Sequence, residues 1–340
     1  MILATTLRRA LRLALVGAVL GWTLGCRAEA PADCPPVAAT LTADQAKAAM
    51  SVARDHGFLW RISKGGHGSY LYGTIHATRL EWLFPGPKVV DAVRRSDAVA
   101  LEIDLSDPDM LRRLTAASPQ PDAAQMSPGG GRASAAPLRK ALPQPLLDRL
   151  QRRMTSECLT DPRFAKMNPG LQVAALTVLA ARRDGIDPSY AVDVMLAGFG
   201  RAAQKAMHSL ETPEAQLAAL GMGSADDGAA LIESALDDLD SNRVRPLLNR
   251  VNEVWAAGDL AELERYREWC ECAKTPAAQR LMTRILEERN PGLADAIDAL
   301  HSSGRRVFAA VGSLHLIGPL GLPALLKQRG YQVEAVAFGR

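Results

Sequence analysis

The sequence predicts an α/β protein, with α+β character, in which helices surround a central mixed sheet and a largely helical insertion occupies the middle. Three observations support this fold class. Strand-like runs gather near both ends of the chain, helical spacing dominates between them, and 48% of the 340 residues are apolar. A chain of this length and apolar content can bury a substantial core. We therefore expect one domain over residues 43–340.

The first part of this domain alternates helix and strand signals. Residues 43–53 have the composition of a short helix. Two β-rich runs, 58–62 and 70–75, flank a Gly-rich turn and so predict a hairpin. A helix over residues 87–95 and a buried strand over 98–103 follow.

The middle of the chain is expected to be mostly helical, and its end returns to strands. Residues 118–137 are rich in Pro, Gly, Ser and Ala, which predicts a long surface loop and leaves open whether it is a lid. The remaining predicted elements are helices near 145–154 and 170–183, a strand at 206–210, helices over 214–303, a strand at 306–311, a helix at 320–329 and a strand at 331–336.

The N-terminus is typical of an export signal. A basic start precedes an apolar stretch over residues 13–24, which is too short for a membrane-spanning helix. We expect a signal peptide over residues 1–26 and a Pro- and Ala-rich linker over 27–42. The formal net charge of +3 comes in part from this basic start, so nucleic acid is not an expected partner.

Two interpretations of signal cleavage remain open. Thr23-Leu24-Gly25-Cys26 resembles a lipobox, in which Cys26 would become a lipidated N-terminus. Ordinary cleavage after Ala30 is the alternative, although Pro31 would hinder it. Either route predicts a periplasmic protein or one anchored by lipid to the cell envelope.

Export also permits disulfides. Besides Cys26 the chain has cysteines at positions 34, 158, 270 and 272, and we expect Cys158 to pair with Cys270 or Cys272. A metal site at Cys270 and Cys272 is the weaker alternative, because no partner pair with zinc-finger spacing exists.

A repeated motif indicates where the chemistry lies. One apolar strand runs into Gly73-Thr74-Ile75-His76 and another into Gly312-Ser313-Leu314-His315. Glycine lets the chain turn sharply or approach a ligand closely, so each histidine can point into the crevice at a strand end. Ligands bind in that crevice in open α/β sheets.

Glu102, inside an apolar strand, is the obvious acid to complete a set with His76 and His315. Two imidazoles and a carboxylate suit zinc, manganese or cobalt and leave an open position for water. The alternative is that each histidine only caps its strand. Taken singly, either histidine favours that alternative, whereas the matched pair with Glu102 favours a site.

Several stretches resemble the TraB/PrgY/GumN family, to which the animal TIKI proteases belong. The resemblance covers nearly the whole mature chain, and its order of motifs is specific. It implies a metal-dependent hydrolase, metalloprotease-like and related in fold to erythromycin esterase and ChaN-like proteins. The stretches concerned are 70–76, 98–104, 210–216, 255–259, 288–290, 308–318 and 325–336.

The resemblance also assigns roles to single residues. It gives His76, His315 and Glu102 the metal or general-base roles, and it gives Arg289 and Asn290 that of polar support for the substrate. On local pattern alone, Arg289 is instead a solvated residue at a helix end.

Two acids are left with open roles. The family has Gly-x-Asp where this chain has Ala191-Val192-Asp193, which leaves a substrate-side role for Asp193 open. Glu211 could face the crevice or cap the helix that Pro213 begins, and capping is the favoured interpretation.

Common enzyme signatures are missing or out of context. Residues 198–203 fit Gly-x-Gly-x-x-Ala but follow a helical pattern, and no nucleophile elbow, Walker A loop or His-Glu-x-x-His occurs. The resemblance, together with the export signal, instead implies an exported hydrolase that cleaves an amide or peptide bond with metal-activated water. The substrate would be a peptide or a small molecule. The alternatives are a non-catalytic envelope binding protein linked to polysaccharide export and a metal-free esterase with a histidine base.

Overall fold

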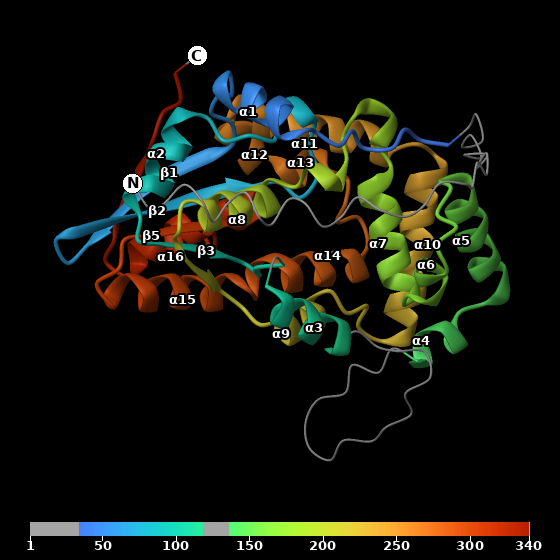
Figure 1. Cartoon of the computed structure of the whole chain (residues 1–340). Helices are drawn as coiled ribbons and strands as arrows, with labels where there is room; N and C mark the ends of the chain where they lie inside the picture. The colour runs from blue at the N-terminus through green and yellow to red at the C-terminus, as the bar shows by residue number, and fades with distance from the viewer. Residues whose placement is uncertain (1–33, 106, 118–135, 340) are drawn as a thin grey trace, which may run out of the picture. The chain divides into compact units, whose positions relative to one another are not determined.

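A computed structural model describes residues 34–105, 107–117 and 136–339, and it confirms the predicted fold class. Six strands form one mixed sheet in the order β4-β3-β5-β2-β1-β6 (Figure 1). The four strands β2 to β5 are parallel neighbours, whereas β1 runs antiparallel to β2 and β6. The strands are β1 (Phe58–Lys64), β2 (His67–Thr74), β3 (Ala98–Leu101), β4 (Ala206–Ser209), β5 (Val307–Gly312) and β6 (Gln332–Ala335).

The predicted elements of the first part are confirmed. Thr42 caps α1 (Ala43–Ser51) in a capping box with Gln45. The hairpin β1–β2 turns at Gly65 and Gly66, which both adopt the positive φ that glycine tolerates. Next come the 3₁₀ turn η1 (Leu80–Trp82), α2 (Pro87–Arg95) and α3 (Pro108–Ala117).

The middle of the chain is helical, as predicted, and has an apolar core of its own. Its members come mainly from α4, α5, α7 and α10, which lie together beside the sheet in Figure 1. The predicted loop over 118–137 falls outside the described residues except at its end, where α4 begins. The elements are α4 (Ala136–Ala141), α5 (Gln144–Ser156), α6 (Pro162–Lys166), α7 (Pro169–Leu179), η2 (Arg182–Asp184), η3 (Pro188–Tyr190), α8 (Val192–Ala202), α9 (Pro213–Ala219) and α10 (Ala225–Asp240).

The remaining helices pack around the sheet. In the view of Figure 1, α11 and α12 lie above the strands and α15 lies below them. Side chains of α2, α8, α11, α12, α15 and α16 join the strands in the main core. The elements are α11 (Val244–Ala257), α12 (Leu260–Glu264), α13 (Tyr266–Trp269), α14 (Pro276–Met282), the π-helix η4 (Thr283–Glu287), α15 (Asn290–Ser302), η5 (Ser313–Leu316) and α16 (Leu322–Gln328).

Gly73 allows β2 to approach η5 closely. A Cβ atom there would lie 2.5 Å from Leu316 Cδ1 and 2.9 Å from Ser313 Oγ. Its carbonyl oxygen accepts a hydrogen bond from the buried Trp255 indole at 2.9 Å. Close approach, and not a positive φ, is therefore the reason that glycine is needed at this position.

The predicted disulfide pairing is wrong. Cys270 and Cys272 are bonded to each other, so neither is the partner of Cys158. Cys34 and Cys158 each take part in a disulfide as well. A local bridge is possible because one intervening residue brings the two Cα atoms to 5.0 Å, within the range that a disulfide spans.

The expected signal peptide and the lipidation candidate Cys26 lie outside the described residues. Within the described part of the chain, we find no helix with both the length and the apolar character that a membrane crossing requires.

Candidate active site

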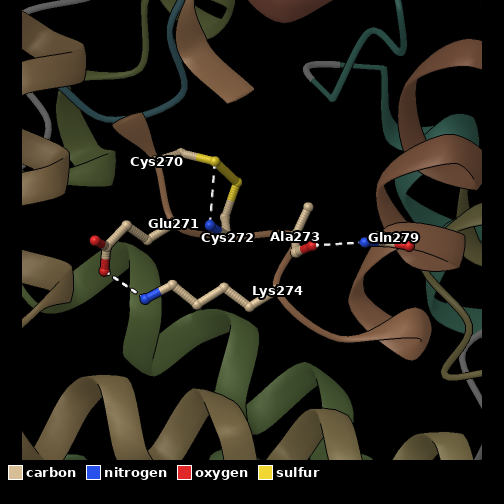
Figure 2. The surroundings of a disulfide bond; sticks show 6 residues. All are labelled: Cys270, Glu271, Cys272, Ala273, Lys274 and Gln279. Atoms are coloured by element: carbon tan, nitrogen blue, oxygen red, sulfur yellow. Dashed lines mark hydrogen bonds and ion pairs between the residues drawn. A yellow bond between two sulfur atoms is a disulfide. The ribbon is translucent and has the colours of Figure 1, made fainter. Parts of the chain in front are cut away.

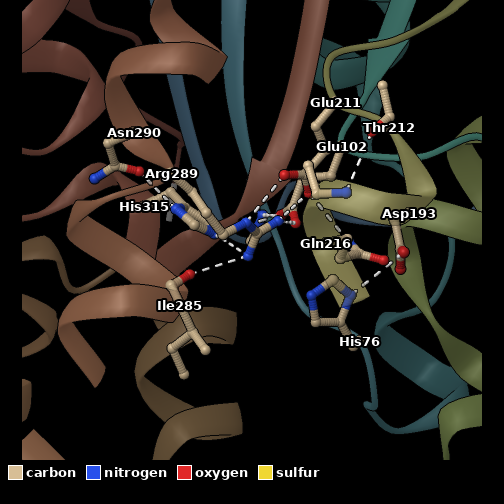
Figure 3. Close-up of polar contacts among 12 residues, drawn as sticks. His76, Glu102, Asp193, Glu211, Thr212, Gln216, Ile285, Arg289, Asn290 and His315 are labelled. Atoms are coloured by element: carbon tan, nitrogen blue, oxygen red, sulfur yellow. Dashed lines mark hydrogen bonds and ion pairs between the residues drawn. The ribbon is translucent and has the colours of Figure 1, made fainter. Parts of the chain in front are cut away.

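Four predicted or considered site residues lie at one edge of the sheet. Glu102 follows β3, Glu211 follows β4 closely, His76 follows β2, and His315 lies in η5 directly after β5. Because these four strands are parallel neighbours, their carboxyl ends meet at this edge. The structure therefore brings together the two histidines and the acid that the sequence singled out (Figure 3).

The space beside Gly312 is where these side chains meet. A Cβ atom on Gly312 would lie 3.3 Å from Glu102 Oε1, 3.4 Å from His76 Nε2 and 3.7 Å from His315 Cδ2. Since φ of Gly312 is −53°, its role is not to allow a left-handed turn. Glycine here leaves a small space open between one carboxylate oxygen and two imidazole rings.

Glu102 is a buried carboxylate with several partners. Its Oε1 accepts from the Gly312 backbone N–H at 2.6 Å, and its Oε2 accepts from Arg289 Nη2 at 2.5 Å. Burial alone would raise the pKa of Glu102. The charges that His315 and His76 carry when protonated, the charge of Arg289 and the Gly312 N–H instead lower it to about 2. Glu102 is therefore ionised at neutral pH.

His315 is held as a neutral ring with one defined tautomer. Arg289 Nη1 can only donate, so His315 Nε2, at 3.2 Å, is the acceptor. Its Nδ1–H then donates to Asn290 Oδ1 at 2.6 Å, while Asn290 Nδ2 donates to Leu320 O at 2.7 Å. Burial, with the charges of Arg289 and His76, outweighs Glu102 and lowers the pKa of His315 to about 4.

The lowered pKa of His315 predicts how stability depends on pH. Between pH 6.5 and 4 the unfolded state binds a proton at this ring and the folded state does not, so stability falls as pH decreases through that range. We expect the free energy of unfolding of His315→Gln to fall by roughly 1–3 kcal/mol less than that of the wild type over this pH range. Urea unfolding of the chelator-treated wild type and variant at several pH values between 6.5 and 4 measures this difference. Equal losses in both proteins would contradict the assignment.

Arg289 connects the acids at the centre of the site. It follows the π-helix η4, and the side chain is only 13% exposed. Its Nε donates to Glu211 Oε2 at 3.1 Å, and Nη2 donates to Glu211 Oε1 and to Glu102. Its Nη1 donates to Ile285 O at 3.0 Å and to His315. All five guanidinium N–H groups are thus used within the protein.

Because these N–H groups are bound within the protein, the prediction from local sequence pattern that Arg289 is solvated is wrong. The same arrangement also limits the polar support that the family resemblance implied, because Arg289 can contact a substrate only by giving up one of these five bonds. The Gly312 N–H is likewise used within the protein, because it donates to Glu102.

The capping role that the sequence favoured for Glu211 is wrong. Thr212, and not Glu211, caps α9, because the Thr212 hydroxyl accepts from Ala215 N at 3.2 Å. Glu211 instead binds Arg289 and accepts from Gln216 Nε2 at 3.2 Å. Its pKa is raised, chiefly by burial, against the effect of Arg289. An acid just past the end of a parallel strand, as Glu102 is after β3, was the signal that could have identified it.

His76 and Asp193 form a second pair on the open side of the site. Val192 N donates to Ile75 O at 3.0 Å, which places the first turn of α8 beside His76. The His76 Nδ1–H donates to Asp193 Oδ2 at 3.3 Å, so Nε2 faces the space beside Gly312. Desolvation opposes protonation, but Asp193 and Glu102 raise the pKa of His76 to about 9. The His76 side chain is 60% exposed and is accessible to a ligand.

Chemically, these side chains are of the types that bind divalent cations. Each imidazole donates Nδ1–H to an oxygen, as is typical of metal-binding histidines, so Nε2 is the atom that could coordinate, in His76 only after it loses a proton. Asp193 Oδ1 is buried and has no hydrogen-bond partner among the described residues. As they stand, however, no three His, Cys, Asp or Glu side chains of the described residues could hold an ion. Arg289 already occupies Nε2 of His315.

A groove of about 900 Å³ leads to this network along β4. It is lined by side chains of β4 and of the flanking helices and reaches Glu211 and Thr212, although neither His76 nor Glu102 lines it. The groove offers an approach to the edge where the site residues lie.

Comparison with known proteins identifies one family. The family described as TraB/PrgY/gumN matches residues 58–335. This range begins at the first residue of β1 and ends at the last residue of β6, so it covers the whole sheet and all the site residues. No curated protein and no solved structure matches the chain.

Proposed function

The chain belongs to the TraB/PrgY/gumN family, and from this premise we propose that it is a metal-dependent hydrolase that cleaves an amide or peptide bond. The observation that carries the proposal is the meeting of His76 Nε2, Glu102 Oε1 and the His315 ring beside Gly312. The amide substrate rests on the resemblance to the TIKI proteases, since a fold alone does not name a substrate.

We propose zinc, manganese or cobalt as the cofactor, held by His76 Nε2 and Glu102 Oε1. His315 Nε2 would be available as a third ligand if Arg289 Nη1 released it. Charge supports this assignment: Glu102 and Glu211 share one guanidinium, that of Arg289, and the negative charges of Asp193 and Glu102 raise the pKa of His76. A cation bound at His76 Nε2 would face the same two carboxylates, Asp193 and Glu102.

When bound, the metal would polarise the scissile carbonyl and lower the pKa of a bound water. Asp193 orients His76 through their hydrogen bond, and its negative charge stabilises positive charge on the imidazole ring. Asn290 fixes the tautomer of His315, and Arg289 binds Glu102 and Glu211 and favours the charged form of both. The chain thus supplies an oriented, charged site, of which Glu211 also lines the groove along β4.

A second candidate mechanism uses no metal. The His76–Asp193 pair resembles the base and orienting acid of serine-type hydrolases, in which the carboxylate holds the imidazole for proton transfer. In that case His76 Nε2 would take a proton directly from water during ester hydrolysis. The raised pKa of His76 is the argument against it, because a ring protonated at neutral pH is not a base.

The deciding measurement is metal content together with hydrolysis of a peptide and ester library. We expect about one divalent ion per wild-type chain, and we expect His76→Ala to lose both the ion and activity, by at least about a hundredfold. His67→Ala is the matched control: His67 lies at the other end of β2 and stacks on His301. A metal-free wild type that still cleaves esters would favour the second mechanism.

A binding protein without catalysis would give a third pattern. His76→Ala would then retain ligand, and no member of the library would be cleaved by the wild type.

We further propose that the protein is exported to the periplasm or anchored by lipid at Cys26, since disulfides persist in oxidising compartments.

A further inference from the structure

The disulfide between Cys270 and Cys272 is unusual because only one residue, Glu271, separates the two cysteines (Figure 2). It lies in the loop between α13 and α14. The entropic stabilisation from a disulfide increases with the length of the loop that it closes. This bond therefore contributes little to global stability, and any effect it has is local.

The backbone and the exposure of this loop favour reversible reduction. Glu271 has φ of +54°, a left-handed conformation that costs energy for a residue with a side chain. Its carboxylate points outward and pairs with exposed Lys274. Cys270 is buried, whereas Cys272 is only half-buried. Strained and accessible disulfides are the ones that thiols reduce most readily.

The disulfide shares an apolar cluster with the elements that hold two site residues. It belongs to an apolar cluster that also contains residues of η4 and residues on both sides of His315. These cluster members are Ile285, Leu286, Leu314 and Ile317. The carbonyl of Ile285 accepts from Arg289 Nη1 at 3.0 Å. In addition, Arg267 of α13 pairs with Glu287 of η4 at 2.6 Å.

We propose that Cys270–Cys272 is a redox modification site whose reduction loosens the support of Arg289 and His315. A thiolate of a small thiol or of a protein dithiol attacks Cys272 Sγ, and the bond to Cys270 breaks. Cys270 leaves as a thiolate and takes up a proton. A second thiol then attacks the mixed disulfide and releases Cys272, so that the reductant gains the disulfide and the chain gains two thiols.

The proposal is independent of the hydrolase function, and its test needs no substrate. The full-length protein is titrated in glutathione redox buffers, and thiols are trapped by alkylation and located by mass spectrometry. We expect Cys270 and Cys272 to become reduced at about a tenfold lower thiol concentration than Cys158, which serves as the internal control. Under the same conditions, circular dichroism should stay unchanged.

Hydrogen exchange tests the link to the site. In the reduced protein and in the Cys270→Ser/Cys272→Ser variant, we expect amide exchange at residues 283–289 and 313–317 to become at least about fivefold faster. Exchange in β1 and β2 should not change. Reduction that occurs only together with Cys158, or wild-type exchange in the double variant, would overturn the proposal.

Discussion

Glu102→Gln is expected to lower hydrolysis by at least about a hundredfold while the protein remains folded. The amide keeps the length of the side chain, and its oxygen can still accept from Gly312 N. It removes the negative charge that faces His76 and that we propose as a metal ligand. Rates on the best substrate of the library, with metal content measured in the same preparations, check this expectation.

Glu233→Gln is the matched control, because Glu233 is an exposed residue of α10. The control should keep full activity and full metal content. If Glu102→Gln lost its metal but hydrolysed normally, the proposed role of the metal would be wrong. If both metal and rate were retained, Glu102 would not belong to the reacting centre.

Arg289→Met is expected to destabilise the protein by about 3–5 kcal/mol at neutral pH. The change leaves the buried carboxylate of Glu102 and the partly buried one of Glu211 next to each other without the cation that both of them bind. Their pKa values in the folded variant should rise above the unfolded values, since burial and a like charge both disfavour ionisation. Urea unfolding at pH 7 measures the loss.

The sign of the pH dependence follows from those raised pKa values. An acid whose pKa is higher in the folded state lowers stability above that pKa, and protonation at lower pH removes the penalty. The deficit of Arg289→Met relative to wild type should therefore be smaller at pH 5 than at pH 7. Adding Glu211→Gln should restore part of the stability.

Arg250→Met provides the comparison for Arg289→Met. Arg250 pairs with Glu262 but is 46% exposed, so its loss should cost no more than about 1 kcal/mol. A deficit of Arg289→Met that is equal at both pH values would contradict the explanation based on buried carboxylates.

Local pattern was sufficient to predict the strands, several helices and three of the candidate site residues that meet at the sheet edge. The hairpin, α2, β3 and β5 each have a continuous apolar run or a clear turn signal, and glycine marks the strand ends before His76 and His315. Glu102 was predictable because a carboxylate inside an apolar strand requires partners.

Long-range partners could not be predicted from local pattern. Arg289 follows a helical stretch and has the local signature of a solvated residue, yet its guanidinium binds Glu102 and Glu211, which are distant in the chain. The pairing of Cys270 was missed for the opposite reason, because a long-range bridge was expected where a local one forms. The family resemblance, and not the spacing of residues, indicated a role for Arg289.

The position of β5 has a consequence for how the chain can fold. This strand lies between β2 and β3, although it is made long after both of them. Until it inserts, the other two strands cannot join into one sheet, and their edges remain open to pairing with other chains. Such distant pairing predicts slow folding and a need for protection from aggregation. A chain that stops before Val307 lacks the centre of its sheet and is expected not to fold at all.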